Sequence, residues 1–448
     1  MNTQKHLYIE TFGCQMNDRD SEIMAQLMAK ENFAPTSDIA CADAIIVNTC
    51  SIRGKAEQKA YSLLGALRKQ KKENPNLLIA VTGCVAQQEG KKMLVRMPHV
   101  NLVVGPQNIY QLPALFEKAG RRSKGLVVTE LSKEFMIPPF LPTMERGLPH
   151  KRFVTIMQGC NNFCTYCIVP YTRGREVSRK CEEILQEIIH LVAGGVKEIT
   201  LLGQNVNSYG NDQPQEQRTT FPELLRLVAE IKGIERLRFT TSNPKDLSEE
   251  LMRCFADIDT LCPHFHLPVQ SGSNKVLKKM NRKYTIENYL EKVEKLRKYS
   301  PDITLTTDII VGFPGEEDED FQATMDLIEK VRYHSAFSFK YSSRPPAKSC
   351  EFEETVTEEE KIKRLAILQD RQNVITKERN EEYVGQLMEL MIEGESKMDG
   401  QWCGRSKTNH TVNFESKDTF IPGQLVMVKI KSTCQNSLLG ELLVKNEK

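Results

Sequence analysis

The chain has 448 residues, of which 40% are hydrophobic, and a formal net charge of only +2. This length predicts two or three domains with cores of their own. No apolar run approaches the 18 residues of a membrane-spanning helix, which excludes an integral membrane protein of the helical kind. The amino terminus has no basic-then-apolar leader, so we expect a cytoplasmic location. In such a chain the 13 cysteines favour metal binding or burial over a disulfide scaffold.

The charge is unevenly distributed along the chain. Residues 1–150 carry +5, residues 151–379 carry −1 and residues 380–448 carry −2, which together make the net charge. Any surface that binds nucleic acid must therefore be a local patch and not a uniformly basic domain.

Residues 1–130 alternate between strand-like and helical patterns. We expect strands at 7–11, 44–48, 77–82 and 102–104, with helices at 18–31 and 56–72. This alternation predicts an open, mostly parallel α/β sheet. Residues 131–150 contain four prolines and little periodicity, so they are expected to form a linker.

Residues 151–380 repeat the alternation at greater length. The expected strands are 153–157, 198–202, 236–240, 264–269, 303–311 and 335–341. Helical patterns lie at 178–193, 221–232, 286–299 and 319–331, and a long helix should run from Thr357 to about residue 383. Six βα units predict a partial (βα)6 barrel with its chemistry at the carboxyl ends of the strands. Residues 381–448 instead contain short alternating runs at 387–392, 410–414, 425–430 and 438–443, which predict a small β-barrel.

Three cysteines form a C-x3-C-x2-C loop just after the predicted strand at 153–157, at Cys160, Cys164 and Cys167. A structural zinc site normally has four ligands, and so does an iron–sulfur cluster. Three thiolates would hold a cubane cluster whose fourth iron is free to bind a small molecule. The alternative is a zinc knuckle with its fourth ligand elsewhere in the chain.

A second set of three cysteines occupies equivalent places in the first segment. Cys14, Cys50 and Cys84 each follow a predicted strand. Parallel neighbours would bring all three to the edge of the sheet where ligands bind. We therefore expect a second cluster with an open iron, although three buried structural cysteines would give the same pattern.

The two cysteine sets and the small carboxyl-terminal β module resemble the methylthiotransferases, a radical S-adenosylmethionine (SAM) family, over nearly the whole chain. The resemblance implies a methylthiotransferase domain, a radical SAM partial barrel and an RNA-binding TRAM domain. It also implies a 4Fe–4S cluster at each cysteine set. The motifs at 11–17, 168–179 and 203–209 are similar to those of the branch that acts on N6-isopentenyladenosine 37 in tRNA anticodon loops.

This resemblance implies that one SAM serves as radical source and another as methyl donor, so that a methylthio group replaces the hydrogen on C2 of the adenosine. The enzyme would need an electron donor such as flavodoxin or ferredoxin, and a sulfur source. Two alternatives remain open. One is the same chemistry on threonylcarbamoyladenosine 37 or on a ribosomal-protein aspartate. The other is a non-catalytic metal-binding module that binds RNA.

Further residues are candidates for binding SAM or RNA. The SAM candidates lie in the cysteine loop or at strand ends, where glycine permits close backbone approach: Tyr166, Gly203, Gln204, Asn205, Gln270 and Gly312. The RNA candidates are Arg173, Arg175 and Arg179 after the cysteine loop, and Trp402, Arg405 and Lys407 in the carboxyl-terminal module. That module carries −2, so it could instead be a folding cap for the barrel.

Overall fold

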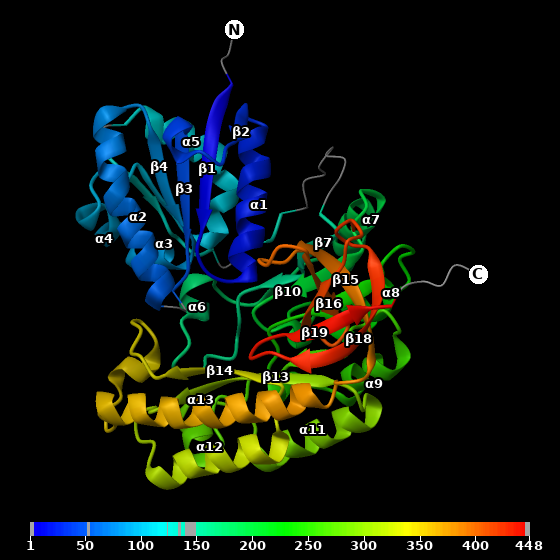
Figure 1. Ribbon diagram of the computed structural model, residues 1–448. Coiled ribbons are helices and arrows are strands. Elements are labelled where there is room, and N and C mark those ends of the chain that lie inside the picture. Colours follow the sequence, from blue (N-terminus) through cyan, green and yellow to red (C-terminus); the bar gives the residue numbers. More distant parts are fainter. Residues whose placement is uncertain (1–3, 52–53, 123, 133–135, 139–148, 444–448) are drawn as a thin grey trace.

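The computed structural model describes residues 4–51, 54–122, 124–132, 136–138 and 149–443 (Figure 1). The first domain is a six-stranded parallel sheet in the order β2-β1-β3-β4-β5-β6. Its strands are β1 (Lys5–Thr11), β2 (Phe33–Pro35), β3 (Ala44–Thr49), β4 (Leu78–Thr82), β5 (Leu102–Val104) and β6 (Leu126–Val128). Its α-helices are α1 (Gln15–Ala29), α2 (Gly54–Glu73), α3 (Gly83–Glu89), α4 (Lys91–Arg96) and α5 (Leu112–Gly120). The predicted open parallel sheet is confirmed.

Helices cover both faces of this sheet, which is why β3 is buried at every position. Successive strand residues point to opposite faces. Ile45 and Val47 accordingly pack with Leu64 and Leu67 of α2, whereas Ile46 packs with Met24 of α1. Because β1, β3 and β4 are adjacent and parallel, their carboxyl ends lie side by side.

The second domain consists of six parallel strands that follow one another in chain order. Three form the sheet β7-β10-β11, three form β12-β13-β14, and a parallel bridge between Leu237 and Leu261 joins the two. The bounds are β7 (Lys151–Thr155), β10 (Glu198–Leu202), β11 (Arg236–Phe239), β12 (His264–His266), β13 (Thr304–Val311) and β14 (Ser335–Lys340). The antiparallel pair β8 (Met157–Gln158) and β9 (Val177–Ser178) flanks the cysteine loop. This arrangement confirms the predicted partial barrel.

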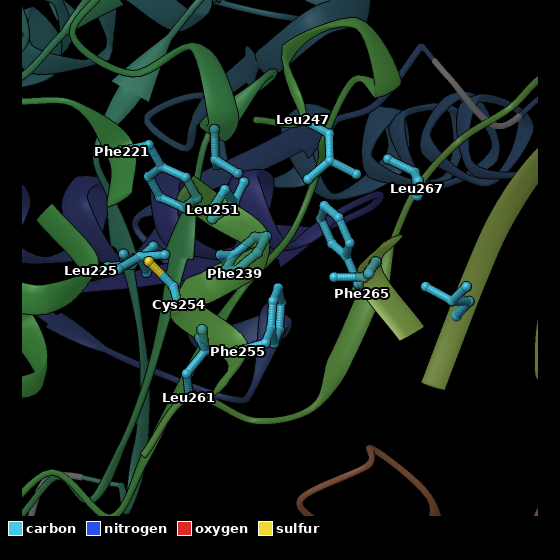
Figure 2. Close-up of a cluster of buried hydrophobic side chains, with 14 of the residues drawn as sticks. Phe221, Leu225, Phe239, Leu247, Leu251, Cys254, Phe255, Leu261, Phe265 and Leu267 are labelled. Carbon is cyan, nitrogen blue, oxygen red and sulfur yellow. The ribbon is translucent and has the colours of Figure 1, made fainter. Parts of the chain in front are cut away.

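The helices of the second domain lie outside its sheet. They are α6 (Val169–Thr172), α7 (Cys181–Ala193), α8 (Phe221–Ala229), α9 (Glu249–Asp257), α10 (Asn274–Lys279), α11 (Ile286–Tyr299), α12 (Asp318–Val331) and α13 (Glu358–Glu381). Figure 2 shows the apolar core beneath α8 and α9. There Phe239 meets Phe221 edge-on at 5.0 Å and Phe265 at 5.4 Å, an arrangement that aromatic rings prefer. No described helix is long and apolar enough to cross a bilayer.

The third domain is a closed barrel in the order β15-β16-β17-β19-β18. Its strands are β15 (Leu387–Glu395), β16 (Gln401–Ser406), β17 (Thr411–Glu415), β18 (Leu425–Thr433) and β19 (Leu438–Leu442). The long helix α13, whose amino end is capped by the Thr357 hydroxyl, leads into it. The predicted small β-barrel is confirmed.

This small barrel is attached to the amino-terminal ends of the partial-barrel strands. We call this end of the partial barrel the floor. Arg236, the first residue of β11, donates to the carbonyl oxygen of Arg405 at 2.5 Å. Arg238 donates to the carbonyl oxygens of Ser406 and Lys407 at 2.8 and 3.0 Å. Thr304, the first residue of β13, donates to Thr408. The cysteine loop, by contrast, lies beyond the carboxyl end of β7.

Candidate functional site

The loop with Cys160, Cys164 and Cys167 is shaped by a glycine that precedes it. Gly159 has φ of +80°, and a Cβ there would lie 1.9 Å from the carbonyl oxygen of Arg175. Only glycine fits this turn. The Gly159 N–H donates to Oε1 of Gln204 at the end of β10, which ties the loop to the strand beside it.

Hydrogen-bond donors and burial together set the chemistry of these thiols. Asn162 donates to the sulfur of Cys160, and the Arg282 guanidinium donates to the sulfur of Cys164, both at 3.4 Å. Burial raises the pKa of Cys167 to about 12, and the neighbouring Cys164 contributes to this rise. Without a metal the Cys167 thiol is therefore held protonated, and metal binding would release its proton.

The amino-terminal cysteines converge from three adjacent strand ends, as predicted. Cys14 is the N-cap of α1, Cys50 follows β3, and Cys84 lies in the first turn of α3. A hydrogen bond from Cys50, assisted by the positive charge of Arg173, lowers the pKa of Cys14 to about 6 despite burial. Burial raises the pKa of Cys84.

The two cysteine sets lie on facing edges of the two sheets. Helix α6 begins two residues after Cys167 and packs against α3, the helix that carries Cys84 (Figure 1). Beyond β14, Arg344 donates to the carbonyl oxygen of Ser51, next to Cys50. The carboxyl edges of both sheets thus meet around α6.

The chemistry of the two donor sets fits iron–sulfur clusters. Each set offers only soft thiols in a largely buried place, with a cation beside it to offset a cluster's negative charge.

The SAM candidates fall around the mouth of the partial barrel. Gly203 directly follows β10, and a Cβ there would lie 2.4 Å from Met157. Gln204 keeps a buried Nε2 that has no hydrogen-bond partner in the described part of the chain, whereas Asn205 is held by Asp246 at 2.7 Å and by Ser208.

The other SAM candidates lie after later strands or in the loop itself. Gln270 follows β12 with φ of +75°. Gly312 follows β13 with φ of +69°, and its N–H donates to the Glu316 carboxylate. Tyr166 is half-buried and packs against a cluster that includes Met280 and Phe313. Contact between SAM and any of these six residues stays a prediction.

The structure corrects three of the six RNA candidates. Arg173 and Arg179 are only 3% and 5% exposed and pair with Asp20 and Glu187, both at 2.7 Å. Trp402 is buried in the core of the small barrel, where it packs edge-on against Phe420. A buried, paired arginine or a core tryptophan cannot reach a phosphate or a base. Asp20 lies 153 positions from Arg173, so the motif alone did not reveal this partner.

The other three RNA candidates have different surroundings. Arg405 donates through two nitrogens to Glu393, each at 3.0 Å, so only part of its guanidinium is available to RNA. Lys407 is half-buried. Arg175 is exposed and stacks over the Phe163 ring at 4.3 Å.

Sequence reasoning missed a cationic cavity beside Cys164. Its volume is about 460 Å³, and three of its lining residues are lysines without a carboxylate partner in the described chain. The lining residues are Phe163, Cys164, Thr165, Tyr171, Lys278, Lys279, Asn281, Lys348 and Phe352. The Lys278–Lys279 pair was the one available signal, but distant segments form this cavity.

Comparison with known proteins agrees with these three domains. The family profiles that match are the Radical SAM superfamily at residues 154–328, Uncharacterized protein family UPF0004 at 6–105 and the TRAM domain at 381–443. A relative from Desulfotalea psychrophila, curated as tRNA-2-methylthio-N(6)-dimethylallyladenosine synthase, is 53% identical over 98% of this chain and 99% of its own. A relative of the same name from Geotalea uraniireducens is 49% identical over 99% and 100%.

Solved structures share the fold at low sequence identity. The radical S-adenosylmethionine methyltransferase TsrM from Kitasatospora setae has a TM-score of 0.54 at 13% identity, over 75% of this chain and 73% of its own. The cobalamin-dependent radical enzyme OxsB has a TM-score of 0.51 at 13% identity, over 78% and 55%.

The partial barrel and its three-cysteine loop define a radical SAM enzyme, with 4Fe–4S clusters and SAM as cofactors. The assignment is narrowed further by the two relatives, which are identical to this chain at about half of the positions over nearly its whole length. The chain belongs to the tRNA-2-methylthio-N(6)-dimethylallyladenosine synthase family and is a transferase.

Proposed function

We propose that this enzyme replaces the hydrogen on C2 of N6-isopentenyladenosine 37 in tRNA anticodon loops with a methylthio group. Full-length relatives of that name support this substrate. The observation that carries the proposal is the meeting of the two cysteine sets around α6. A reaction that both generates a radical and delivers sulfur needs both sites beside one substrate carbon.

In this proposal Cys160, Cys164 and Cys167 hold the cluster that binds SAM, and Cys14, Cys50 and Cys84 hold the second. Bound together, the clusters and SAM supply radical chemistry for a C–H bond that is too weakly acidic for an ordinary general base. The chain contributes the burial that limits water access to the loop. Arg282 donates a hydrogen bond to Cys164 and helps to hold the loop in place.

Of the RNA contacts first expected, the proposal keeps Arg175 and adds the lysines of the cavity beside Cys164. Exposed Arg175 and the cavity lysines Lys278, Lys279 and Lys348 lie around the cysteine loop, together with the rings of Phe163 and Tyr171. Cations with aromatic faces suit a single-stranded loop, since they bind phosphates and stack on bases. An electron donor of the flavodoxin or ferredoxin type and a sulfur source complete the proposal, and we place the reaction in the cytoplasm, where tRNA is used.

The decisive test is the nucleoside profile of tRNA from a deletion strain. We expect the methylthio form of isopentenyladenosine to be missing and to return when the wild-type gene is supplied, as measured by mass spectrometry. A profile that lacks instead the methylthio form of threonylcarbamoyladenosine, or an intact tRNA profile with an unmodified ribosomal protein, would contradict the proposal.

The roles of the two cysteine sets can be separated in the purified enzyme. Cys164→Ala should abolish reductive SAM cleavage, whereas the triple change of Cys14, Cys50 and Cys84 to Ala should retain some cleavage but lose methylthiolation. Each variant should lose about four irons. Cys434→Ala, at an exposed position, is the control. Wild-type iron content in the triple variant would show that these cysteines are not ligands.

A further inference from the structure

Arg173, the first residue after α6, belongs to the radical SAM domain but lies inside the amino-terminal site. Its Nη2 donates to Asn17 at 3.1 Å and to the Asp20 carboxylate at 2.7 Å. Both partners are on α1, the helix that Cys14 caps. One guanidinium therefore joins the start of this helix to the neighbouring domain.

The guanidinium also lies close to two of the cysteines. Arg173 interacts with the thiol of Cys84 and acts through its charge on Cys14 as well. Its Nη1 is buried and has no hydrogen-bond partner among the residues that the structure describes. A buried charged donor without an acceptor is costly, so its retention here calls for an acceptor that binds later.

We propose that Arg173 is a positioning residue for the amino-terminal cluster, with Nη2 anchored to α1 and Nη1 available to donate to the sulfur atoms of the cluster. This inference rests on the proposed second cluster at Cys14, Cys50 and Cys84. Hydrogen bonds and positive charge near the sulfurs raise the reduction potential of a cluster. Arg173 should therefore make this cluster easier to reduce and slower to lose iron.

Arginine suits this role because it presents several donors in a fixed fork, whereas lysine has one nitrogen at the end of a flexible chain. The segment that joins Arg173 to the cysteine loop is also short. Five residues separate Arg173 from Cys167, so the chain that anchors the first cluster reaches directly to the second. The contact would thus hold the second site in register with the first.

The test uses the full-length chain with Cys160, Cys164 and Cys167 changed to Ala, so that only the amino-terminal cluster can assemble. In this background we compare Arg173→Met, Arg173→Lys and the control Arg68→Met, which removes an exposed arginine of α2 in the same domain as the cluster. The readouts are the midpoint potential from a titration followed by electron paramagnetic resonance, and the rate of iron loss to a chelator.

We expect Arg173→Met to lower the equilibrium constant for one-electron reduction of the cluster about tenfold. This corresponds to a shift of the midpoint potential by roughly 59 mV to lower values. Iron loss should be about tenfold faster. Arg173→Lys should lie in between, and it keeps the test informative where the Met variant folds poorly. Arg68→Met should match its parent.

A second comparison separates contact with the cluster from a simple bond between domains. Asp20→Asn removes the anchoring carboxylate but leaves the guanidinium in place. Equal shifts in potential for Asp20→Asn and Arg173→Met would overturn the inference, as would wild-type potential and iron loss in Arg173→Met. A parent variant that binds no iron at all would overturn the two-cluster proposal itself, and the inference with it.

Discussion

Glu393 on β15 binds two cations from different domains. It accepts from Lys151 of β7 at 2.6 Å and from both Nε and Nη2 of Arg405. Burial alone would raise the pKa of this carboxyl, but Arg405 and then Lys151 outweigh it and lower the pKa from 4.5 to about 2. The carboxylate therefore stabilises the junction between the small barrel and the floor.

This shift predicts a pH-dependent stability. A carboxyl whose folded pKa is lowered contributes fully above pH 4.5 and loses its contribution as the pH falls toward 2. In the apo-protein, Glu393→Gln should lower the unfolding free energy by about 1–3 kcal/mol at pH 7, and the difference from wild type should shrink below pH 4.5. Denaturant unfolding across a pH series measures it. Exposed Glu395→Gln on the same strand is the control, and a gap that persists at pH 2 would contradict the assignment.

Gly83 shows how a backbone requirement shapes the amino-terminal site. Its φ is +89°, and a Cβ would lie 2.3 Å from the carbonyl oxygen of Thr49, directly before Cys50. Gly83→Ala should displace the Cys50 or Cys84 backbone, destabilise the domain by about 1–3 kcal/mol and reduce bound iron by as much as one cluster. Iron analysis and thermal unfolding measure both effects.

Gly65→Ala is the matched control for that change. Gly65 lies in the exposed part of α2 with nothing within 4 Å of a new Cβ. Alanine there should leave iron content unchanged and stabilise the helix by about 0.5–1 kcal/mol. Iron loss in both variants would mean that the effect at Gly83 is not local.

At the level of elements, periodicity predicted most of the strands. The predicted bounds of β5, β10 and α11 agree with the structure because each is a clear apolar run or an amphipathic pattern. The three-residue strands β2 and β6 were missed, although β6 has the same Leu-Val-Val sequence as β5. Strand β16 was missed because polar residues alternate with its buried positions, including Gly404 and Ser406.

The cysteines of the candidate site were predictable because their spacing is local or repeated at each strand end. The arginines were not. Arg173 and Arg175 look alike in sequence, but one is buried against Asp20, 153 positions away, and the other lies on the surface. Only the packing of two domains decides between these environments.

Helix α10 provides the third test, through its terminal lysines. Changing Lys278 and Lys279 to Ala should weaken tRNA binding. It should also make the slope of the logarithm of the binding constant against the logarithm of the salt concentration shallower by about 1.4, since each phosphate contact to a single strand contributes roughly 0.7 to that slope. Binding across a salt series measures this.

Lys295 and Lys298 on α11, which pair with Glu291 and Glu294, form the control pair. Equal losses in both double variants would indicate a general charge effect. Unchanged tRNA affinity, accompanied by slower reduction by a protein electron donor but not by a chemical reductant, would assign the cavity to that donor.

For the whole molecule, the attachment of the small barrel changes what its removal should do. Arg236 is fully buried, and its guanidinium is bound by the Arg405 carbonyl and by Glu389. Truncation near Gly385 would leave this charge without those partners. We expect at least about 3 kcal/mol of lost stability, seen as a fall in Tm of 6 °C or more, besides weaker tRNA binding. An unchanged Tm would show that the floor does not depend on this domain.

The position of the small barrel also constrains the RNA. It lies at the start of strands whose far ends carry the cysteine loop, and the eight residues of β13 alone span about 26 Å. An RNA held at both places must run along the outside of the partial barrel. A bare anticodon loop can occupy only the mouth, whereas a loop with its full stem is long enough to reach the small barrel. The affinity for the RNA should therefore rise with stem length once the stem is long enough to reach the small barrel. The distance between the two sites would thus select RNAs by their length.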